Sequence, residues 1–255
     1  MLLDAKKLLA ERELELRAAR KKITIQPGLA LIWVGDDPAT AAFIRAKERL
    51  SKKLDCQFFL HHFEAVETRQ LAALIKGLNT RKDIHGIVLQ LPLPKHIDTQ
   101  KLIDTILPAK DVDNLQNHIQ KPWSTPQGII DLLRANNIDP ATRQTIILGE
   151  GRLVGAPLAE LFRSNGWSFE QISSEAEKHA HKIRQHDLLI ACTGVPGLVS
   201  AEMVNSTMVV VDGSGVDVEA AAIEKLVTAI TPTKGAVGPL TVTQLFANLL
   251  QAASG

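Results

Sequence analysis

Short apolar runs alternate with longer amphipathic stretches along the first 110 residues. Runs of strand length lie at 28–34, 56–63 and 84–91, and stretches with helical spacing lie at 3–22, 38–54 and 67–79. Pro38 begins the second of these stretches, which suits the first turn of a helix. Nearly continuous apolar strands separated by helices predict a parallel sheet that is covered on both faces.

The same pattern restarts after a stretch rich in proline and polar residues, 108–126. Strands are expected at 145–148, 168–172, 187–192, 208–212 and 227–230, and helices at 153–165, 175–185 and 240–253. Two α/β units with a joint near 114–125 fit this order better than one continuous sheet.

Composition and charge argue against several classes of protein: disordered, nucleic-acid-binding and membrane-spanning. Hydrophobic residues make up 45% of the chain and charged residues 22%, which excludes a mainly disordered chain. The 29 Lys and Arg balance the 28 Asp and Glu, so no basic excess favours nucleic acid as a partner. The apolar runs are too short to cross a membrane, and the charged N-terminus does not resemble a signal peptide. Cys56 and Cys192 lie in apolar runs, which predicts buried thiols in a reducing, cytoplasmic compartment.

Open parallel sheets bind ligands at the carboxyl ends of their strands, so polar or glycine-rich departures there are candidate sites. Gly149–Gly155 (GEGRLVG) follows one such strand. Its spacing, G-x-G-x-x-x-G, is one residue longer than the usual dinucleotide fingerprint, so taken alone it fits a plain tight turn equally well. Its position between a strand and a helix favours a nucleotide phosphate site over the plain turn. After the next strand, Ser173 and Ser174 with Arg152 could hold a ribose phosphate. Glu175 could instead bind a free ribose hydroxyl, and the sequence leaves both open.

Two further departures lie in the first half of the chain. Gln90 ends an apolar strand just before Leu-Pro-Leu-Pro, so it either points into a site or is solvated in a rigid loop. Lys47 shares a helix face with Phe43, but a lysine on a helix is by default a solvated charge. His61-His62 and His179-x-His181 do not share faces, so no metal site is expected.

Ordered motifs across residues 27–250 resemble those of the bifunctional methylenetetrahydrofolate dehydrogenase/methenyltetrahydrofolate cyclohydrolase family. The matching segments are VGDDPAT (34–40), FIRAK (43–47), GIVLQLPLP (86–94), KDVD (110–113), TPxG (125–128), VGAP (154–157), DLLI (187–190), GxPG (194–197) and VGPLTV (237–242). The Leu-Gln-Leu-Pro-Leu-Pro segment together with the distant Val-Gly-Pro-Leu-Thr is the most specific combination.

The resemblance implies two α/β domains with a cleft between them. The first is a folate-binding, catalytic domain, 1–118, with a C-terminal helix, 240–255, that packs back on it. The second, 119–239, is a Rossmann-like NAD(P)-binding domain. The implied enzyme oxidises methylenetetrahydrofolate with NADP, or with NAD, and hydrolyses the methenyl product to formyltetrahydrofolate. A homodimer is also implied.

The resemblance further assigns residue roles. Lys47 matches the catalytic lysine, Gln90 the glutamine that holds it, and Asp113 the acid that binds the pterin edge. The expected folate-binding residues are Phe43, Thr40, Leu91, Pro92, Val237, Gly238, Pro239 and Thr241. The expected cofactor-binding residues are Gly149, Gly151, Arg152, Leu153, Val154, Pro157, Ser173, Ser174, Thr193, Gly194 and Pro196.

The chain also departs from the family pattern. Phe43 replaces a tyrosine, Asn114 a glycine, Gly151 a serine, Lys234-Gly235-Ala236 a Pro-Gly-Gly, and Asp212-Gly213-Ser214-Gly215 an Asp-Val-Gly. Most of these departures lie in the nucleotide half. Two alternatives therefore stay open: a cyclohydrolase with weak or lost dehydrogenase activity, and a non-enzymatic folate or dinucleotide binder. A shikimate-dehydrogenase-like oxidoreductase shares the two-domain plan but does not account for Leu-Pro-Leu-Pro.

Overall fold

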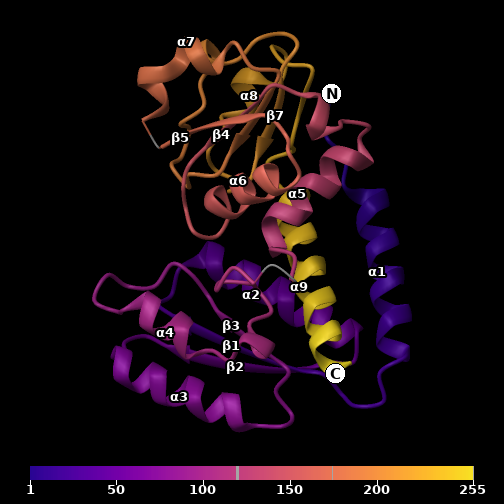
Figure 1. The fold of residues 1–255 in the computed structure, drawn as a ribbon, viewed down its shortest axis with the longest axis vertical. Coiled ribbons are helices and arrows are strands. Elements are labelled where there is room, and N and C mark those ends of the chain that lie inside the picture. The colour runs from indigo at the N-terminus through magenta and orange to yellow at the C-terminus, as the bar shows by residue number, and fades with distance from the viewer. Residues whose placement is uncertain (119–120, 174, 255) are drawn as a thin grey trace. The chain divides into compact units, whose positions relative to one another are not determined.

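The computed structural model describes residues 1–118, 121–173 and 175–254, and the chain divides into two compact units (Figure 1). One unit comprises Arg12–Ser124 and Val242–Gly255, and the other comprises Met1–Glu11 and Thr125–Thr241. The first contains a parallel sheet in the order β2-β1-β3, and the second a parallel sheet in the order β5-β4-β6-β7-β8. The predicted α/β class with two domains is confirmed.

The elements follow one another in the order expected for alternating strands and helices. In the first half they are α1 (Lys6–Lys21), β1 (Gly28–Val34), α2 (Pro38–Lys53), β2 (Gln57–Phe63), α3 (Thr68–Thr80), β3 (Gly86–Leu89) and α4 (Thr99–Thr105). In the second half they are α5 (Ser124–Ala135), β4 (Thr145–Leu148), α6 (Gly155–Ser164), β5 (Phe169–Ile172), α7 (Ala180–Ile183), β6 (Leu188–Ala191), β7 (Val209–Asp212), α8 (Ala220–Ile223), β8 (Ala229–Ile230) and α9 (Val237–Ala253). Short 3₁₀ turns lie at Pro108–Lys110, Pro140–Thr142, Ala176–His179 and Ala201–Met203.

Several element predictions were wrong in detail. The strand expected at 84–91 is shorter, and the helix expected at 175–185 is a 3₁₀ turn followed by the single turn α7. Helices α4, α5 and α8 were not predicted. Helix α5 begins inside the proline-rich stretch, because Pro126 lies in its first turn, where a helix tolerates proline.

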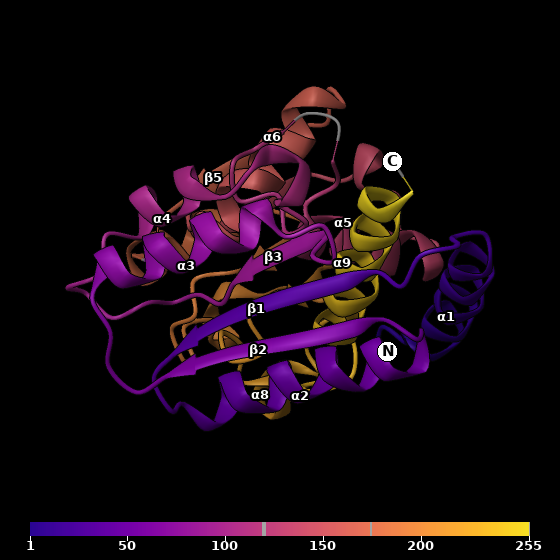
Figure 2. The same ribbon diagram turned by 90° about the horizontal axis from the view of Figure 1, so that it is seen from below.

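The three-stranded sheet has apolar side chains on both faces. Along β1, Leu29 and Leu31 pack in a cluster with residues of α1, α2 and α9, whereas Ala30 and Ile32 pack in a second cluster with residues of α3 and α4. Figure 2 shows α2 and α3 on opposite sides of these strands. This burial explains why the strand reads as a continuous apolar run rather than an alternating one.

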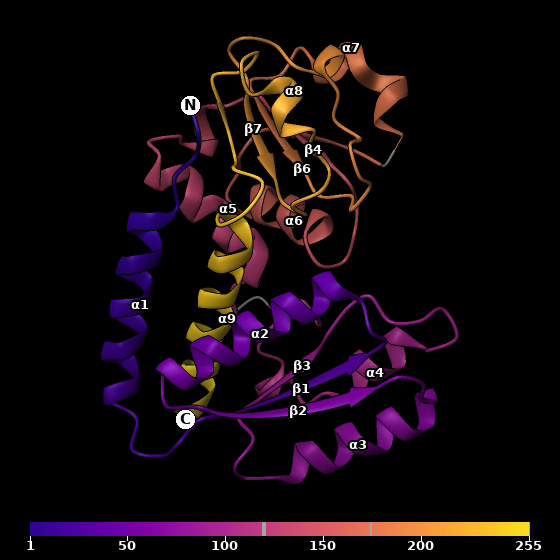
Figure 3. The ribbon, with the colours of Figure 1, turned by 180° about the vertical axis from the view of Figure 1, so that it is seen from behind.

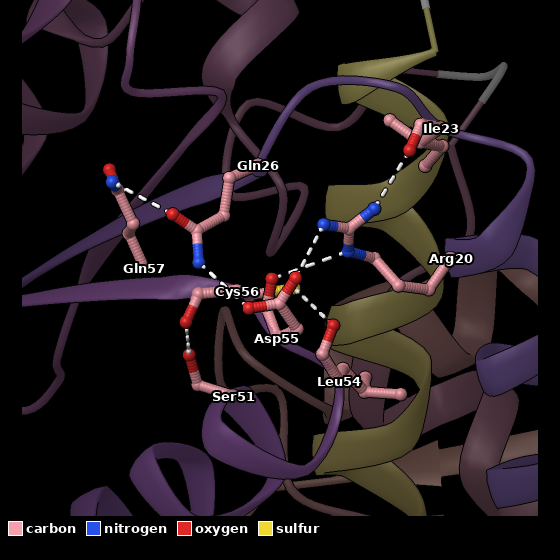
Figure 4. A network of polar contacts seen from close by, with 8 residues as sticks. All are labelled: Arg20, Ile23, Gln26, Ser51, Leu54, Asp55, Cys56 and Gln57. Atoms are coloured by element: carbon pink, nitrogen blue, oxygen red, sulfur yellow. Dashed lines mark hydrogen bonds and ion pairs between the residues drawn. The ribbon is translucent and has the colours of Figure 1, made fainter.

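In this unit, a polar network joins the segment before β1 to the turn between α2 and β2 (Figure 4). Arg20, near the end of α1, donates from Nη2 to Asp55 Oδ2 at 2.9 Å, and Gln26 Nε2 donates to Asp55 Oδ1 at 2.9 Å. Gln57 donates in turn to Gln26 Oε1 at 3.0 Å. These bonds tie the segment before β1 to the turn between α2 and β2, and so help to hold α2 against the sheet.

The five-stranded sheet is also covered on both faces (Figure 3). Ile147 and Ile190 pack with α5 and α6, and Ile146 and Leu189 pack with α7 and α8. The N-terminal residues extend the β8 edge, because Leu3 N–H donates to Ile230 C=O at 2.8 Å. This pairing places Met1–Glu11 in the same unit as the five-stranded sheet, whereas the sequence assigned them to the first domain.

Burial of the two cysteines is confirmed. Both are free thiols, and burial raises the pKa of Cys56 to about 11 and that of Cys192 to about 12. Among the described residues, no helix combines the length and apolar character needed to cross a membrane.

Candidate active site

Helix α2 carries Lys47 into the interior of the three-stranded unit. Pro38 occupies the first turn, and the Asp37 carboxylate caps the helix by accepting from Thr40 N–H at 2.7 Å. The cap and the proline fix where the helix begins, and therefore which residues face the sheet. Lys47 is on the buried face and only 2% exposed, so the expectation of a solvated surface lysine does not hold.

Gln90 meets Lys47 from the end of β3. Its N–H still donates to Ile32 C=O at 2.9 Å, so the backbone continues the sheet by one bond after the strand ends. The Lys47 Nζ donates to Gln90 Oε1 at 2.9 Å, and Gln90 Nε2 donates to the Leu91 C=O at 3.1 Å. Gln90 is 9% exposed, so its amide is buried and hydrogen-bonded rather than solvated in the loop.

Asp113 lies on a segment that runs beside β3. Asp111 pairs with Ile87 of β3 in a parallel bridge, and its buried carboxylate accepts from Leu115 N–H at 3.1 Å and Gln116 N–H at 2.9 Å. Asp113 follows two residues later and is partly exposed. Its charge is close enough to act on Lys47. Lys47 thus has Gln90 as its hydrogen-bond partner and Asp113 as a neighbouring negative charge.

Asn114 explains one departure from the family pattern. Its φ is +58°, a left-handed conformation that asparagine tolerates better than most residues other than glycine. Its side chain accepts from His118 N–H at 2.7 Å and donates to Lys121 C=O at 2.6 Å. Asn248 of α9 adds a bond to the Val112 C=O at 2.9 Å. Asn114 and Asn248 fix the turn that carries Asp113, and neither was singled out from the sequence.

Burial lowers the pKa of Lys47, while the negative charge of Asp113 opposes the shift. The Lys47 Nζ also lies 4.6 Å from the centre of the Phe43 ring. Phe43 is partly exposed. An amine with a lowered pKa loses its proton more readily than an exposed lysine, and the neutral form can accept a proton.

The five-stranded unit has its own candidate ligand edge. The chain leaves β4 for β5 on one side and then crosses to β6 on the other, so the direction of winding changes between β4 and β6. In open α/β sheets, nucleotides bind in the crevice at this point, beyond the carboxyl ends of the strands. The turns that follow β4 and β6 contain most of the predicted cofactor residues; Pro157 lies in α6, and Ser173 follows β5.

In the turn after β4, backbone atoms of neighbouring segments lie so close together that glycine is required at two positions. Gly149 has φ +107°, and a Cβ there would lie 2.8 Å from the Cys192 carbonyl oxygen; a Cβ on Gly155 would lie 2.3 Å from Gly149 O. Gln171 Nε2 donates to Gly149 O at 2.9 Å and to Gly155 O at 3.1 Å. Gln171 thus holds both ends of the turn, a role that the sequence did not indicate. No side chain caps the N-terminus of α6, which leaves the arrangement suited to a phosphate.

The other predicted cofactor residues occupy different environments. Gly151, Arg152, Leu153, Ser173, Gly194 and Pro196 are exposed, Val154 and Thr193 are partly buried, and Pro157 is buried in the first turn of α6. Ser174 lies outside the described residues. Glu175, the alternative ribose-binding residue, forms an exposed ion pair with Lys178 at 2.8 Å.

The predicted folate-binding residues outside the three-stranded unit begin α9. Val237 is buried in the core of its own unit, and the Thr241 hydroxyl donates to Val237 C=O at 3.0 Å. Gly238 and Pro239 are partly exposed. In the other unit, Thr40 and Leu91 are partly exposed and Pro92 is exposed. No group of three or more His, Cys, Asp or Glu residues in the described parts of the chain could hold a metal ion.

Comparison with known proteins agrees with both units. A family model described as tetrahydrofolate dehydrogenase/cyclohydrolase, catalytic domain, matches residues 3–113, and the NAD(P)-binding domain of the same family matches residues 123–255. The bifunctional protein FolD of Exiguobacterium sibiricum is 35% identical over 99% of this chain and 99% of its own length.

Solved structures give the same result. The bifunctional enzyme FolD, methylenetetrahydrofolate dehydrogenase/cyclohydrolase, from Campylobacter jejuni is 30% identical, with a TM-score of 0.87 over 100% of this chain and 98% of that one. The methylenetetrahydrofolate dehydrogenase-cyclohydrolase of Trypanosoma brucei, complexed with NADP cofactor and inhibitor, is 25% identical, with a TM-score of 0.89 over 100% and 97%.

Proposed function

Because this chain belongs to the tetrahydrofolate dehydrogenase/cyclohydrolase family, we propose that Lys47 is the proton-transfer group of its reaction. The enzyme interconverts one-carbon derivatives of tetrahydrofolate: it oxidises methylenetetrahydrofolate to the methenyl form and hydrolyses that form to formyltetrahydrofolate. The observation that carries the proposed role is the buried hydrogen bond between Lys47 and Gln90.

In the hydrolysis, neutral Lys47 accepts a proton from water while the water oxygen bonds to the cationic methenyl carbon. One of the two carbon–nitrogen bonds of this adduct then breaks: the departing nitrogen takes the proton from Lys47, and the new hydroxyl group loses its own proton to solvent as it becomes the formyl carbonyl. A neighbouring cation disfavours the ammonium form of the lysine further, so bound substrate adds to the effect of burial. Gln90 keeps the Lys47 side chain at one position by accepting from Nζ.

Asp113 and Phe43 have binding roles in this proposal. A partly exposed carboxylate is suited to accept charge-assisted hydrogen bonds from the amino edge of a pterin. The Phe43 ring provides a flat apolar surface against which the folate can stack. It has no hydroxyl, so this chain lacks the hydrogen bond that a tyrosine could make at that position.

NADP is the cofactor of the oxidation step and, when bound, accepts the hydride from methylenetetrahydrofolate. We assign its phosphates to the turn 149–154 and its ribose phosphate to the region of Arg152 and Ser173. The close approach of Gly149 and Gly155 supports this assignment, because a side chain at either position would fill the space where backbone must pass.

A methylenetetrahydrofolate oxidation assay with NADP and NAD titrated separately, run beside methenyl hydrolysis, tests the proposal. We expect turnover with NADP and hydrolysis in the same preparation. Hydrolysis without turnover on either nucleotide would favour the cyclohydrolase whose dehydrogenase step is lost. Binding of folate without either reaction would favour the non-enzymatic binder.

We also propose a cytoplasmic location and a homodimer. The location is supported by two buried free thiols, which suit a reducing compartment. The dimer rests on the family resemblance and on the prevalence of two-fold symmetric pairs. Light scattering after size exclusion should give twice the mass of one chain, and a monomer at working concentration would exclude the dimer.

A further inference from the structure

The chain after β6 is fastened to a second loop of the same unit. Gly197 N–H donates to Val216 C=O at 3.0 Å, and Val199 N–H donates to Asp217 C=O at 2.9 Å. A parallel bridge joins Val199 to Val218. Backbone bonds therefore hold the far end of this loop, while its first residues, which lie nearest the candidate nucleotide edge, have to be held in another way.

The Asp217 side chain holds those first residues. It is fully buried, and its Oδ2 accepts from Thr193 N–H at 2.7 Å. Its Oδ1 accepts from the Thr193 hydroxyl at 2.8 Å and from Val195 N–H at 2.8 Å. A buried carboxylate that accepts three short bonds from one turn fixes that turn firmly, because each bond is charge-assisted and has little competition from water.

The turn that Asp217 holds contacts the phosphate turn. A Cβ placed on Gly149 would lie 3.2 Å from the Thr193 side-chain methyl group. Gly194 and Val195 of the same turn are exposed, with Val195 41% exposed. The two turns at the end of β4 and β6 are therefore packed together, and a shift of one changes the surface that both present.

The side chain of a second acid in this region, Asp212, accepts hydrogen bonds from residues of its own loop. Its Oδ1 accepts from Gly215 N–H at 2.7 Å and from Ser214 N–H at 3.1 Å, and its Oδ2 accepts from Val218 N–H at 3.2 Å. These bonds fix the loop 212–218, which is one of the places where the chain departs from the family pattern. The fixed loop positions the Asp217 side chain next to the turn after β6.

We propose that Asp217 is a positioning residue for nucleotide binding. It sets the Thr193–Val195 turn against the Gly149 turn in the geometry that NADP requires, and it touches neither nucleotide nor folate itself. This proposal rests on the assignment of NADP to these turns.

The test compares Asp217→Asn with Glu219→Gln, which neutralises an exposed carboxylate two residues along. Asparagine keeps the size of the side chain but replaces one acceptor oxygen with an amide donor. We expect the Kd for NADP by calorimetry and the KM for NADP to rise about tenfold or more in Asp217→Asn. Its kcat at saturating NADP, and its methenyl hydrolysis measured without nucleotide, should stay within about twofold of wild type. Glu219→Gln should leave all four values unchanged.

Unchanged NADP affinity in folded Asp217→Asn would overturn the proposal. So would a parallel fall of kcat and hydrolysis, because that result would indicate a general structural role. If Asp217→Asn does not fold, Asp217→Glu replaces it: the longer side chain keeps the charge but displaces the carboxylate from the Thr193 and Val195 N–H groups, so this variant should bind NADP more weakly while its methenyl hydrolysis without nucleotide is unchanged. Failure of the wild-type enzyme to bind NADP at all would instead overturn the nucleotide assignment itself.

Discussion

The Lys47 ammonium and the Gln90 amide oxygen are 2.9 Å apart in a buried setting, and the two side chains come from α2 and from the end of β3. An amide oxygen that accepts from Nζ stabilises the charged form of the lysine. Gln90 therefore partly offsets the effect of burial, which lowers the pKa of Lys47.

Replacing Gln90 should shift the pH dependence of hydrolysis in opposite directions for two variants. The rate rises with pH as Lys47 becomes neutral. Gln90→Ala removes the acceptor, lowers the pKa of Lys47 further and moves this rise to lower pH. Gln90→Glu places a carboxylate there and moves the rise to higher pH.

The pH–rate profile of methenyl hydrolysis measures both shifts. In Gln90→Ala, the plateau rate should also fall about tenfold, because the lysine is less well oriented. Equal shifts of both variants in one direction would show that Gln90 does not act on the protonation of Lys47.

Lys47→Met should make the protein more stable while it removes activity. A buried amine with a lowered pKa costs folding free energy, because the unfolded chain holds its proton more readily. Methionine of similar length removes that cost, and we expect the free energy of unfolding to rise by about 1 kcal/mol or more at neutral pH.

The stability gained by Lys47→Met should decrease as pH rises. Below the folded pKa of Lys47 the cost is present in full, and it disappears as pH rises toward the ordinary lysine pKa of ~10.4. Urea unfolding at about pH 6 and about pH 9 should therefore give a larger difference between variant and wild type at the lower pH. A loss of stability in Lys47→Met at both pH values would contradict the direction given for this group.

Gly151→Ser should improve NADP binding without a cost in stability. A Cβ on Gly151 meets nothing within 4 Å, and its backbone is not in the left-handed region. The added hydroxyl restores the side chain that the family pattern has in the phosphate turn. We expect the KM for NADP to fall by about threefold to tenfold, as for one added hydrogen bond.

Gly155→Ala is the matched control in the same turn. Its Cβ would lie 2.3 Å from Gly149 O, so the variant should lose about 1–3 kcal/mol of unfolding free energy and bind NADP more weakly. Equal behaviour of the two variants would mean that this turn does not contact a phosphate.

Asn114→Ala should destabilise the turn that carries Asp113 more than Asn114→Gly does. Both variants lose the side-chain bonds to residues 118 and 121, but only alanine is strained at φ +58°. We expect a difference of about 1 kcal/mol in unfolding free energy between them. If the two variants unfold at the same urea concentration, backbone strain is not what selects the residue at this position.

Much of the fold follows from local pattern, and the exceptions have identifiable causes. β1 and β4 were placed correctly because buried parallel strands leave uninterrupted apolar runs. Helix α5 was missed because prolines mask its start, and α8 is a single turn with too little sequence for a periodicity. The helix expected at 175–185 has a helical pattern but only short turns, because tertiary context overrides propensity in so short a segment.

Some residues of the candidate site could be predicted from the sequence, and others could not. Residues in ordered motifs could be named, but spacing alone could not distinguish a buried Lys47 from a solvated one, because its burial depends on packing between α2 and β3. Asn248, Gln171 and Asp217 act through backbone groups far from them in sequence, for which a single sequence gives no signal.

The rate of methenyl hydrolysis by Lys47→Met tests the central claim most directly. Lys52→Met, which removes an exposed lysine of the same helix, serves as the control. The account predicts a fall of about 10²- to 10⁴-fold, toward the spontaneous rate, in a protein whose urea unfolding transition remains cooperative. The control should hydrolyse at the wild-type rate. Hydrolysis by Lys47→Met well above the spontaneous rate would contradict the role given to this amine.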